Sequence, residues 1–379
     1  MKLYFSFLLS IFLGTIAVIL FVKTSDAGLG EGKLTKKEIV PFQTQRAFNH
    51  NRVERVLNSL TLEEKIAQMI ISYPQLDKEG PVRTGGVIFV GKMLQNKKKV
   101  REIVRSTLIR SRIPLFFAAD IEGGTINPVS NYPVVDNLPS AREMSYLPDK
   151  VVEEWGFQVG LTMSSIGLNV NLAPVLDVAE VGHMYQNRRS FSGDPKTVLK
   201  SGRAYARGLL KAQILPVGKH FPGYGNARQD TDHKLVKVEW GVPEIEKMMG
   251  VFNGAKGWLG GVMLSNLIYT SYSNYPAILT KKLVKEAKKH GLLTITDDLA
   301  VKILAKSVGG SREEVVRRAF LAGNDLLLTT APPDWKKGVD YVGVIYQLVE
   351  NSPQLKQQLN ASCYRILSMK DRMGMLKNL

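Results

Sequence analysis

Cysteine and histidine are scarce in this sequence, and their scarcity excludes several classes of protein. Cys363 is the only cysteine among 379 residues, so the chain forms no intramolecular disulfide and no cysteine-based zinc site. We expect the lone thiol to fill space in the core. The five histidines are dispersed, and none shows the paired helical spacing with a glutamate that marks a zinc hydrolase. The sequence therefore predicts no metal site.

Signatures for cofactors and nucleic acids are also missing. The run Gly223-Tyr224-Gly225 lacks the third glycine of a dinucleotide fingerprint and does not open directly into a helix. No recognition helix, zinc finger or single-strand-binding signature is present. No internal repeat or low-complexity segment stands out. We therefore expect neither a cofactor nor a nucleic-acid partner.

Acidic residues are few relative to basic ones. The chain has 34 Asp and Glu against 51 Lys and Arg, which gives a formal net charge of +17. Much of the excess lies in lysine-rich stretches such as residues 96–101 and 280–289, and such runs are usually solvated helix faces. The same charge would favour contact with an anionic envelope surface, whether a polymer or a lipid.

The N-terminus carries a long apolar run. Lys2 precedes the almost entirely apolar residues 3–22, and Lys23 closes the run. A run of this length can span a bilayer as a helix, whereas Ser25-Asp26-Ala27 fits a signal-peptide cleavage site. We interpret residues 1–27 as a signal peptide or, in preference, a membrane anchor, and residues 28–51 as a linker. The remainder, residues 52–379, is then exported: it faces the outside of the cytoplasmic membrane or is secreted or periplasmic.

Helical and strand patterns alternate through the rest of the chain. Residues 53–71 have helical periodicity, with Thr61 as an N-terminal cap. Beyond them, apolar runs followed by helical patterns occur about seven times. The runs span residues 85–90, 113–119, 169–173, 213–217, 261–265, 292–296 and 325–328. Strands that are apolar throughout are typical of a parallel sheet covered on both faces. They favour an α/β fold, either a barrel or an open doubly wound sheet.

Polar residues follow many of these strands, and their number favours the barrel. They are Asp120, Asp177, Lys219 with His220, Asn266 and Asp297. A barrel gathers the loops of many strands at one face, whereas an open sheet concentrates its functional residues at one switch point. We therefore predict a TIM-like (β/α)8 barrel, regular or irregular, preceded by the N-terminal hydrophobic helix.

The segment 219–233 carries the densest set of chemical groups. Lys219 and His220 stand where the apolar run 213–217 should end, and the Pro-Gly-Tyr-Gly run at 222–225 requires a sharp turn. The polar loop after this turn contains Asp230, Asp232 and His233. Charged groups at a strand end, followed by a titratable loop, are typical of a barrel active site. A surface turn with ordinary polar residues is the alternative.

Six segments together resemble one enzyme family. They are DIEGG at 120–124, NLAPVLD at 171–177, RSF at 189–191 with DP at 194–195, KHFPGYG at 219–225, PAILT at 276–280 and TDDL at 296–299. In this order they resemble glycoside hydrolase family 3, and most closely its single-domain bacterial β-N-acetylglucosaminidases, or β-hexosaminidases. The resemblance extends from about residue 57 to residue 328 and implies a TIM-like barrel.

The resemblance also implies a function and a set of site residues. It implies retaining hydrolysis through two displacements, with Asp297 at the position of the nucleophile. Four further residues match positions that hold sugar hydroxyls: Asp120, Arg189, Lys219 and His220. The implied substrate is a carbohydrate carrying terminal β-linked N-acetylglucosamine or a related sugar, such as peptidoglycan or another envelope glycan.

The chain departs from the family pattern at three places. The relatives use an aspartate and a histidine two residues later as acid/base pair. Counted from Lys219, these positions hold Asp230 and Asp232, and His233 comes one residue late. The relatives carry arginines after Gly124, where this chain has 125–128 as Thr-Ile-Asn-Pro. Asn266 stands where many relatives have a histidine.

Two hypotheses of function follow. In the first, the chain is an exported glycosidase in which Asp230, Asp232 or His233 provides acid/base catalysis. In the second, the departures leave a catalytically impaired barrel that binds glycan or acts as an envelope scaffold.

Overall fold

The structure is a computed structural model that describes residues 48–74, 82–289, 291–331 and 339–379. The apolar run interpreted as a signal peptide or anchor, and nearly all of the expected linker, lie outside these residues. Within the described part of the chain, no helix combines the length and the apolar character needed to cross a bilayer.

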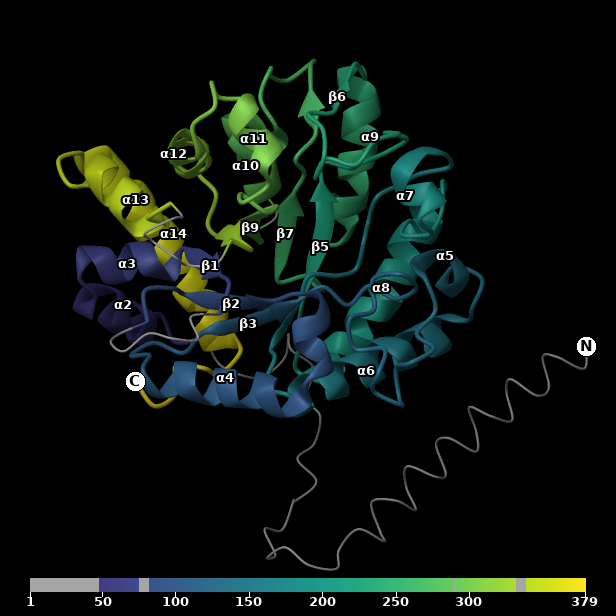
Figure 1. Ribbon diagram of the computed structural model, residues 1–379, viewed down its shortest axis with the longest axis horizontal. Helices are drawn as coiled ribbons and strands as arrows, with labels where there is room; N and C mark the ends of the chain where they lie inside the picture. Colours follow the sequence, from purple (N-terminus) through teal and green to yellow (C-terminus); the bar gives the residue numbers. More distant parts are fainter. Residues whose placement is uncertain (1–47, 75–81, 290, 332–338) are drawn as a thin grey trace, which may run out of the picture. The chain divides into compact units, whose positions relative to one another are not determined.

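Eight parallel strands form one sheet that curls into a barrel (Figure 1). In sheet order they are β10 (Leu327–Thr329), β1 (Ile70–Ser72), β2 (Gly86–Phe89), β3 (Phe116–Ala119), β4 (Val170–Asn171), β5 (Leu215–Phe221), β7 (Gly261–Leu264) and β9 (Leu293–Thr296). A parallel bridge between Ile295 and Leu326 joins the two ends of the sheet. The barrel prediction is confirmed, and the open doubly wound alternative is excluded.

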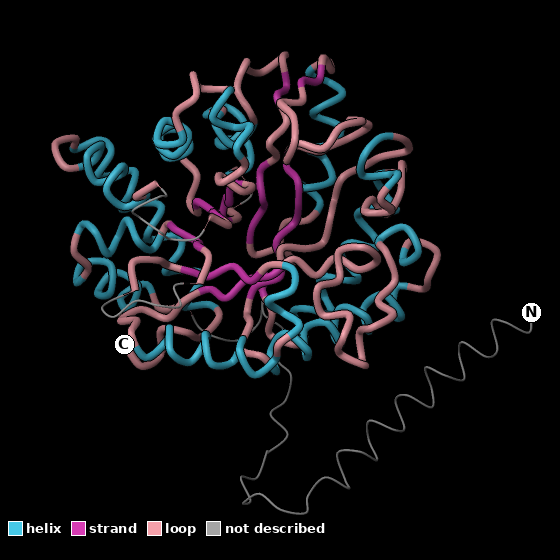
Figure 2. The backbone as a smooth tube through the Cα atoms, viewed as in Figure 1, coloured by secondary structure: helices cyan, strands magenta, loops and turns pink. Residues whose placement is uncertain are grey.

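Helices surround the strands, as the tube in Figure 2 shows with strands in magenta and helices in cyan. The longer ones are α2 (His50–Ser59), α4 (Lys97–Ile109), α6 (Asp149–Ser165), α8 (Pro195–Lys211), α9 (Val242–Gly254), α10 (Lys281–Lys288), α12 (Arg312–Ala322), α13 (Tyr341–Val349) and α14 (Pro353–Arg372). The shorter ones are α3 (Leu62–Gln68), α5 (Ala141–Met144), α7 (Gly182–Gln186), α11 (Lys302–Lys306) and the 3-10 turns η1 (Gly91–Gln95) and η2 (Ala277–Leu279). A small outer sheet pairs β6 (Lys237–Val238) with β8 (Ile268–Tyr269).

Side-chain caps explain where several helices begin. Asn96 accepts from the backbone N–H of Lys99 at the start of α4, and Asp194 accepts from Thr197 N–H (2.9 Å) at the start of α8. Each cap satisfies an N–H group that has no partner within its helix. Such local signals make helix ends readable from sequence.

The first barrel strand contradicts the sequence prediction. Residues 53–71 were expected to be helical throughout, but after α2 and α3 the helical structure ends at Gln68, and Ile70–Ser72 is β1. Thr61 starts α3 through a capping box with Glu64, as its sequence indicated. The strand escapes a periodicity argument because it is three residues long and follows α3 with no Gly or Pro between them. It belongs to the sheet because it pairs with β2 and β10.

Besides the large core around the barrel, a smaller apolar cluster joins the two ends of the described chain. It contains Val53, Val56, Leu60, Ile113, Cys363, Leu367 and Leu376, which bring α2 against α14. Cys363 has no exposed surface, so the expectation of a core-filling thiol is confirmed.

The seam between β9 and β10 depends on one buried carboxylate, that of Asp325. Its oxygens accept from the backbone N–H of Thr294 on β9 (3.1 Å) and from Arg365 Nη2 on α14 (2.6 Å). Lys288 Nζ on α10 lies 2.9 Å away. Burial alone would raise the pKa of Asp325, but Lys288 and Arg365 outweigh it and hold the pKa below its ordinary value. Asp325 therefore links two strands and two helices at the closure of the barrel.

Asp325→Ala should lower the free energy of unfolding by about 3–5 kcal/mol, because both cations and Thr294 lose their acceptor. Chemical denaturation at pH 7 measures the loss. Because the folded pKa is depressed, this stabilisation is complete above the unfolded pKa of about 4 and disappears as pH falls through the folded value.

The matched control for this prediction is Asp149→Ala, which removes an exposed carboxylate paired with Lys200. Exposed pairs contribute about 0–1 kcal/mol. Equal losses in the two variants would contradict a special role of Asp325 at the seam.

Candidate active site

A pocket of about 550 Å³ opens at the carboxyl ends of the barrel strands. Residues on or just after β2, β3, β4, β5, β7, β9 and β10 contribute to its wall. Seven of the eight residues singled out from the sequence line it: Asp120, Arg189, Lys219, His220, Asp230, Asp232 and Asp297. His233 is not among the lining residues, and its side chain is exposed. The strand ends therefore converge as expected, but the histidine after them does not join the pocket.

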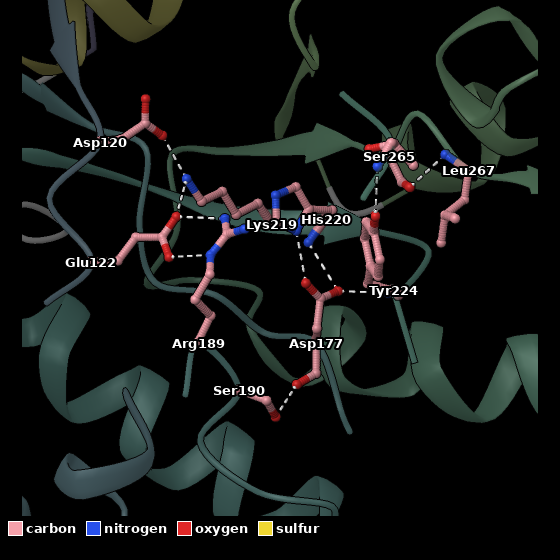
Figure 3. Close-up of polar contacts among 12 residues, drawn as sticks. Asp120, Glu122, Asp177, Arg189, Ser190, Lys219, His220, Tyr224, Ser265 and Leu267 are labelled. Atoms are coloured by element: carbon pink, nitrogen blue, oxygen red, sulfur yellow. Dashed lines mark hydrogen bonds and ion pairs between the residues drawn. The ribbon is translucent and has the colours of Figure 1, made fainter. Parts of the chain in front are cut away.

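A chain of four charges forms one wall of the pocket (Figure 3). Arg189 donates two hydrogen bonds to Glu122, Nε to Oε2 and Nη2 to Oε1, both at 2.8 Å. Lys219 Nζ lies 2.7 Å from Glu122 Oε1 and donates to Asp120 Oδ1 at 2.5 Å. The side chains of Glu122 and Lys219 are only 3% exposed, whereas that of Asp120 is 34% exposed. Asp120 is thus the accessible end of the chain of charges.

The mutual attraction of these groups keeps the buried ones ionised. Burial would raise the pKa of Glu122, but Arg189 and Lys219 outweigh it and hold that pKa well below its usual range. Burial would lower the pKa of Lys219, but Asp120 and Glu122 outweigh it and raise that pKa. At neutral pH the wall therefore presents charged donors and acceptors, which bind hydroxyl groups directionally.

His220 is oriented by a buried aspartate, Asp177. Asp177 Oδ2 lies 2.7 Å from His220 Nδ1, and Oδ1 accepts from the backbone N–H of Tyr224 (2.6 Å) and of His220 (3.2 Å). The Lys219–His220 peptide bond is cis. Because Asp177 engages Nδ1, the other nitrogen, Nε2, is the one that His220 can offer to a ligand.

Two adjacent aspartates after β9 lie in different environments. The carboxylate of Asp298 accepts from the backbone N–H groups of Ala300 and Thr330, both at 2.9 Å, and from the Thr330 hydroxyl. Asp297 Oδ1 accepts only the backbone N–H of Asp298 (2.8 Å) among the hydrogen bonds of the described residues. Burial raises the pKa of Asp297 to about 6, with His220 opposing and Asp232 adding to the shift. Both aspartates line the pocket, but the carboxylate of Asp298 is held by the turn, which leaves that of Asp297 as the one with fewer hydrogen bonds.

The loop that holds Asp230 and Asp232 is anchored by Tyr224. The Tyr224 hydroxyl donates to Gln229 O (2.8 Å) and accepts from Thr231 N–H (3.1 Å). Asp230 Oδ1 accepts the backbone N–H of Asp232 at 3.0 Å. Loss of hydration at the pocket wall raises the pKa of Asp232, and the negative charges of Asp230 and Asp298 add to the shift. The loop thus supplies two carboxylates to the pocket.

Sequence reasoning did not assign three residues that the geometry makes important: Glu122, Asp177 and His183. Glu122 lies inside the DIEGG segment, and Asp177 follows a strand, so both were within reach of a strand-end argument. His183, on α7, had no comparable signal, yet it lines the pocket.

The departures from the family pattern also have definite places in the structure. Thr125 and Ile126 line the pocket, so its wall is uncharged where the relatives carry arginines. Asn266 is buried, and its amide atoms have no hydrogen-bond partner among the described residues. Within the described part of the chain, no three His, Cys, Asp or Glu side chains are grouped as a metal ion would require.

Comparison with known sequences points to one family. Residues 61–369 match the model of the glycosyl hydrolase family 3 N-terminal domain. The chain is 27% identical over 282 residues to a β-hexosaminidase of Haemophilus influenzae, covering 71% of this chain and 78% of the relative. It is 29% identical over 255 residues to a β-hexosaminidase of Tolumonas auensis, covering 64% of this chain and 75% of the relative.

Solved structures share the fold. A β-N-acetylhexosaminidase from Beutenbergia cavernae superposes with a TM-score of 0.71 at 20% identity, covering 83% of this chain and 99% of the other. A family 3 β-N-acetylglucosaminidase from Paenibacillus sp. gives 0.73 at 22% identity, covering 84% of this chain and 63% of the other.

Removing the charge of Asp297 or of Asp298 should have opposite effects on stability. Asp297→Asn should raise the free energy of unfolding by about 1–3 kcal/mol at pH 7.5, because it removes a charge that burial disfavours. The raised folded pKa means that the folded state binds the extra proton between about pH 4 and pH 6. The wild type therefore loses stability as pH rises through that window, and the advantage of the variant vanishes near pH 4.

The matched control is Asp298→Asn, which leaves hydrogen-bond partners unsatisfied and should cost about 1–3 kcal/mol. Thermal and chemical unfolding of both variants at pH 4 and pH 7.5 make the comparison. If Asp297→Asn lowers the free energy of unfolding at pH 7.5, the buried charge of Asp297 does not destabilise the fold.

Proposed function

Because the chain belongs to glycosyl hydrolase family 3, we propose that it hydrolyses the bond to a terminal β-linked N-acetylglucosamine or a related sugar. The observation that carries this proposal is the position of Asp297, which lines one pocket with the four-charge wall. The curated relatives named above, β-hexosaminidases, support the choice of sugar.

Asp297 acts as the nucleophile in this proposal. Its carboxylate attacks the anomeric carbon, the bond to the leaving oxygen breaks, and a glycosyl-enzyme forms. Water then attacks the same carbon and releases Asp297, so the configuration is retained. A carboxylate attacks only when ionised, and a pKa of about 6 leaves Asp297 ionised at neutral pH.

The charged wall binds the sugar ring. Asp120 accepts from ring hydroxyls, and Lys219, Arg189 and His220 donate to them. Glu122 and Asp177 position these groups from behind: Glu122 between Lys219 and Arg189, and Asp177 on the imidazole of His220. Thr125 and Ile126 leave one part of the wall uncharged, and that part contacts uncharged groups of the ligand.

The expected location of the enzyme outside the cytoplasm indicates its natural substrate. The apolar residues 3–22 support export, with residues 1–27 as anchor or signal peptide, 28–51 as linker and 52–379 as the glycosidase domain. A net charge of +17 favours an anionic envelope surface. We therefore place the substrate in peptidoglycan or another envelope glycan.

A second candidate function is a family 3 barrel with impaired chemistry that binds glycan or acts as an envelope scaffold. The observation that favours it is the exposed position of His233 outside the pocket lining. Calorimetry separates the two candidates. The impaired barrel should bind sugar without turning it over, and Asp297→Ala should keep that binding.

Nitrophenyl N-acetyl-β-glucosaminide should be cleaved by the wild type, and Asp297→Ala should abolish cleavage because the attacking oxygen is removed. Release of nitrophenol measures both. Asp149→Ala, which removes an exposed ion pair between α6 and α8, should keep wild-type kcat/KM. If wild type and Asp297→Ala are equally inert on a panel of aryl glycosides, the proposed hydrolysis is wrong.

The pH profile should follow the ionisation of Asp297. Since protonation removes the nucleophile, kcat/KM should fall about tenfold per pH unit below about pH 6. Initial rates between pH 4 and pH 8, with substrate far below KM, give the profile. A rate that stays constant down to pH 4 would contradict a nucleophile with a raised pKa.

A further inference from the structure

Helix α7 is docked directly onto the loop that carries Asp230 and Asp232. The backbone N–H of His183 donates to Ala227 O at 2.7 Å, and Asn226 Oδ1 accepts from Glu180 N–H at 3.1 Å. Gly182 has a φ of 82°, and a Cβ there would lie 2.5 Å from Ala227 O. Only glycine permits this approach, so the backbone fixes where α7 lies relative to the loop.

This docking brings the imidazole of His183 into the pocket wall. The side chain is half-buried and lines the pocket together with Asp230 and Asp232. Its ring centroid lies 6.0 Å from that of Tyr224, the residue that anchors the loop. The side-chain amide of Asn187 lies 3.4 Å from His183 Nδ1, which leaves Nε2 for a ligand.

The surroundings of His183 suit a group that exchanges a proton. Burial lowers its pKa, Asp230 and Asp232 raise it, and Arg189 and His220 lower it, with a net shift below the ordinary value. The two carboxylates stabilise the imidazolium, and the opposing effects keep the neutral form accessible. No other described histidine combines access to the pocket with a ring nitrogen that a buried carboxylate does not already hold.

We propose that His183, and not the loop residue His233, is the acid/base group of the glycosidase reaction. This assignment rests on the proposed function of the same pocket. The loop supplies carboxylates where relatives have an aspartate and a histidine, and α7 supplies the imidazole from a different part of the chain.

The two steps balance with His183 as the only proton carrier. In the first step, the imidazolium donates its Nε2 proton to the glycosidic oxygen. That oxygen leaves the anomeric carbon as the carboxylate of Asp297 bonds to the same carbon. In the second, the neutral imidazole takes a proton from water as the water oxygen bonds to the anomeric carbon and Asp297 leaves. His183 ends as the imidazolium, ready for the next turnover.

The test compares aryl N-acetyl-β-glucosaminides that differ in leaving group. A 2,4-dinitrophenyl group leaves without a proton, whereas a phenyl group requires one. His183→Asn should keep kcat/KM for the dinitrophenyl substrate within about tenfold of wild type and lose about 10²–10⁴-fold on the phenyl substrate. Azide should accelerate turnover of the dinitrophenyl substrate and yield the β-glycosyl azide, since azide attacks without a general base.

The matched control is His50→Asn, which removes an exposed imidazole on α2 and should resemble wild type on both substrates. Thermal unfolding of His183→Asn should match that of wild type, because the side chain reaches solvent. His183→Gln provides a second variant of different length.

Several results would overturn the assignment. One is wild-type activity of His183→Asn on the phenyl substrate. Another is the leaving-group and azide signature in His233→Asn or Asp232→Asn but not in His183→Asn. Equal loss on all substrates without azide rescue would show a positioning role only. A wild type inert on both substrates would instead remove the proposed function, and the assignment with it.

Discussion

The pocket depends on the ion pairs that the carboxylate of Glu122 forms with Arg189 and Lys219. This carboxylate is almost fully buried, and it accepts from two cations that come from different parts of the chain, Lys219 on β5 and Arg189 before α8. None of these three charges is tolerable in the interior without the others, because the desolvation of each is offset only by its partners. The positions of strand β5 and of the segment before α8 are therefore coupled. This coupling also holds Asp120, the accessible end of the network, in position through its contact with Lys219.

Sequence patterns predicted the barrel because its signals are local. Continuous apolar runs marked the barrel strands other than β1, and the cap residue Thr61 marked the start of α3. β1 was missed because its three residues follow α3 directly and look like a last helical turn. Convergence of Asp120, Lys219 and Asp297 was also predictable, since parallel strands bring their carboxyl ends to one face.

The rest of the candidate site was hidden because it depends on contacts between distant elements. Asp177 was visible at a strand end, but its partner, His220, is set by the fold. His183 carries no pattern at all, since its place depends on the close approach at Gly182. Counting along the loop put the family's histidine position on Asp232 and left His233 one residue late, and in the structure His233 is exposed and outside the pocket lining. Spacing in sequence predicts neighbours within one element and not across two.

The buried thiol of Cys363 has a practical consequence for work on this molecule. Burial raises the pKa of Cys363 to about 12, so almost no thiolate exists at neutral pH, and the side chain has no exposed surface. Thiolates are the species that react with alkylating reagents. Because no other cysteine occurs in the chain, the folded protein is already a background free of competing sites for maleimide chemistry. A cysteine introduced on the Asp230 loop would carry a fluorophore or spin label at that one position, without prior removal of native thiols.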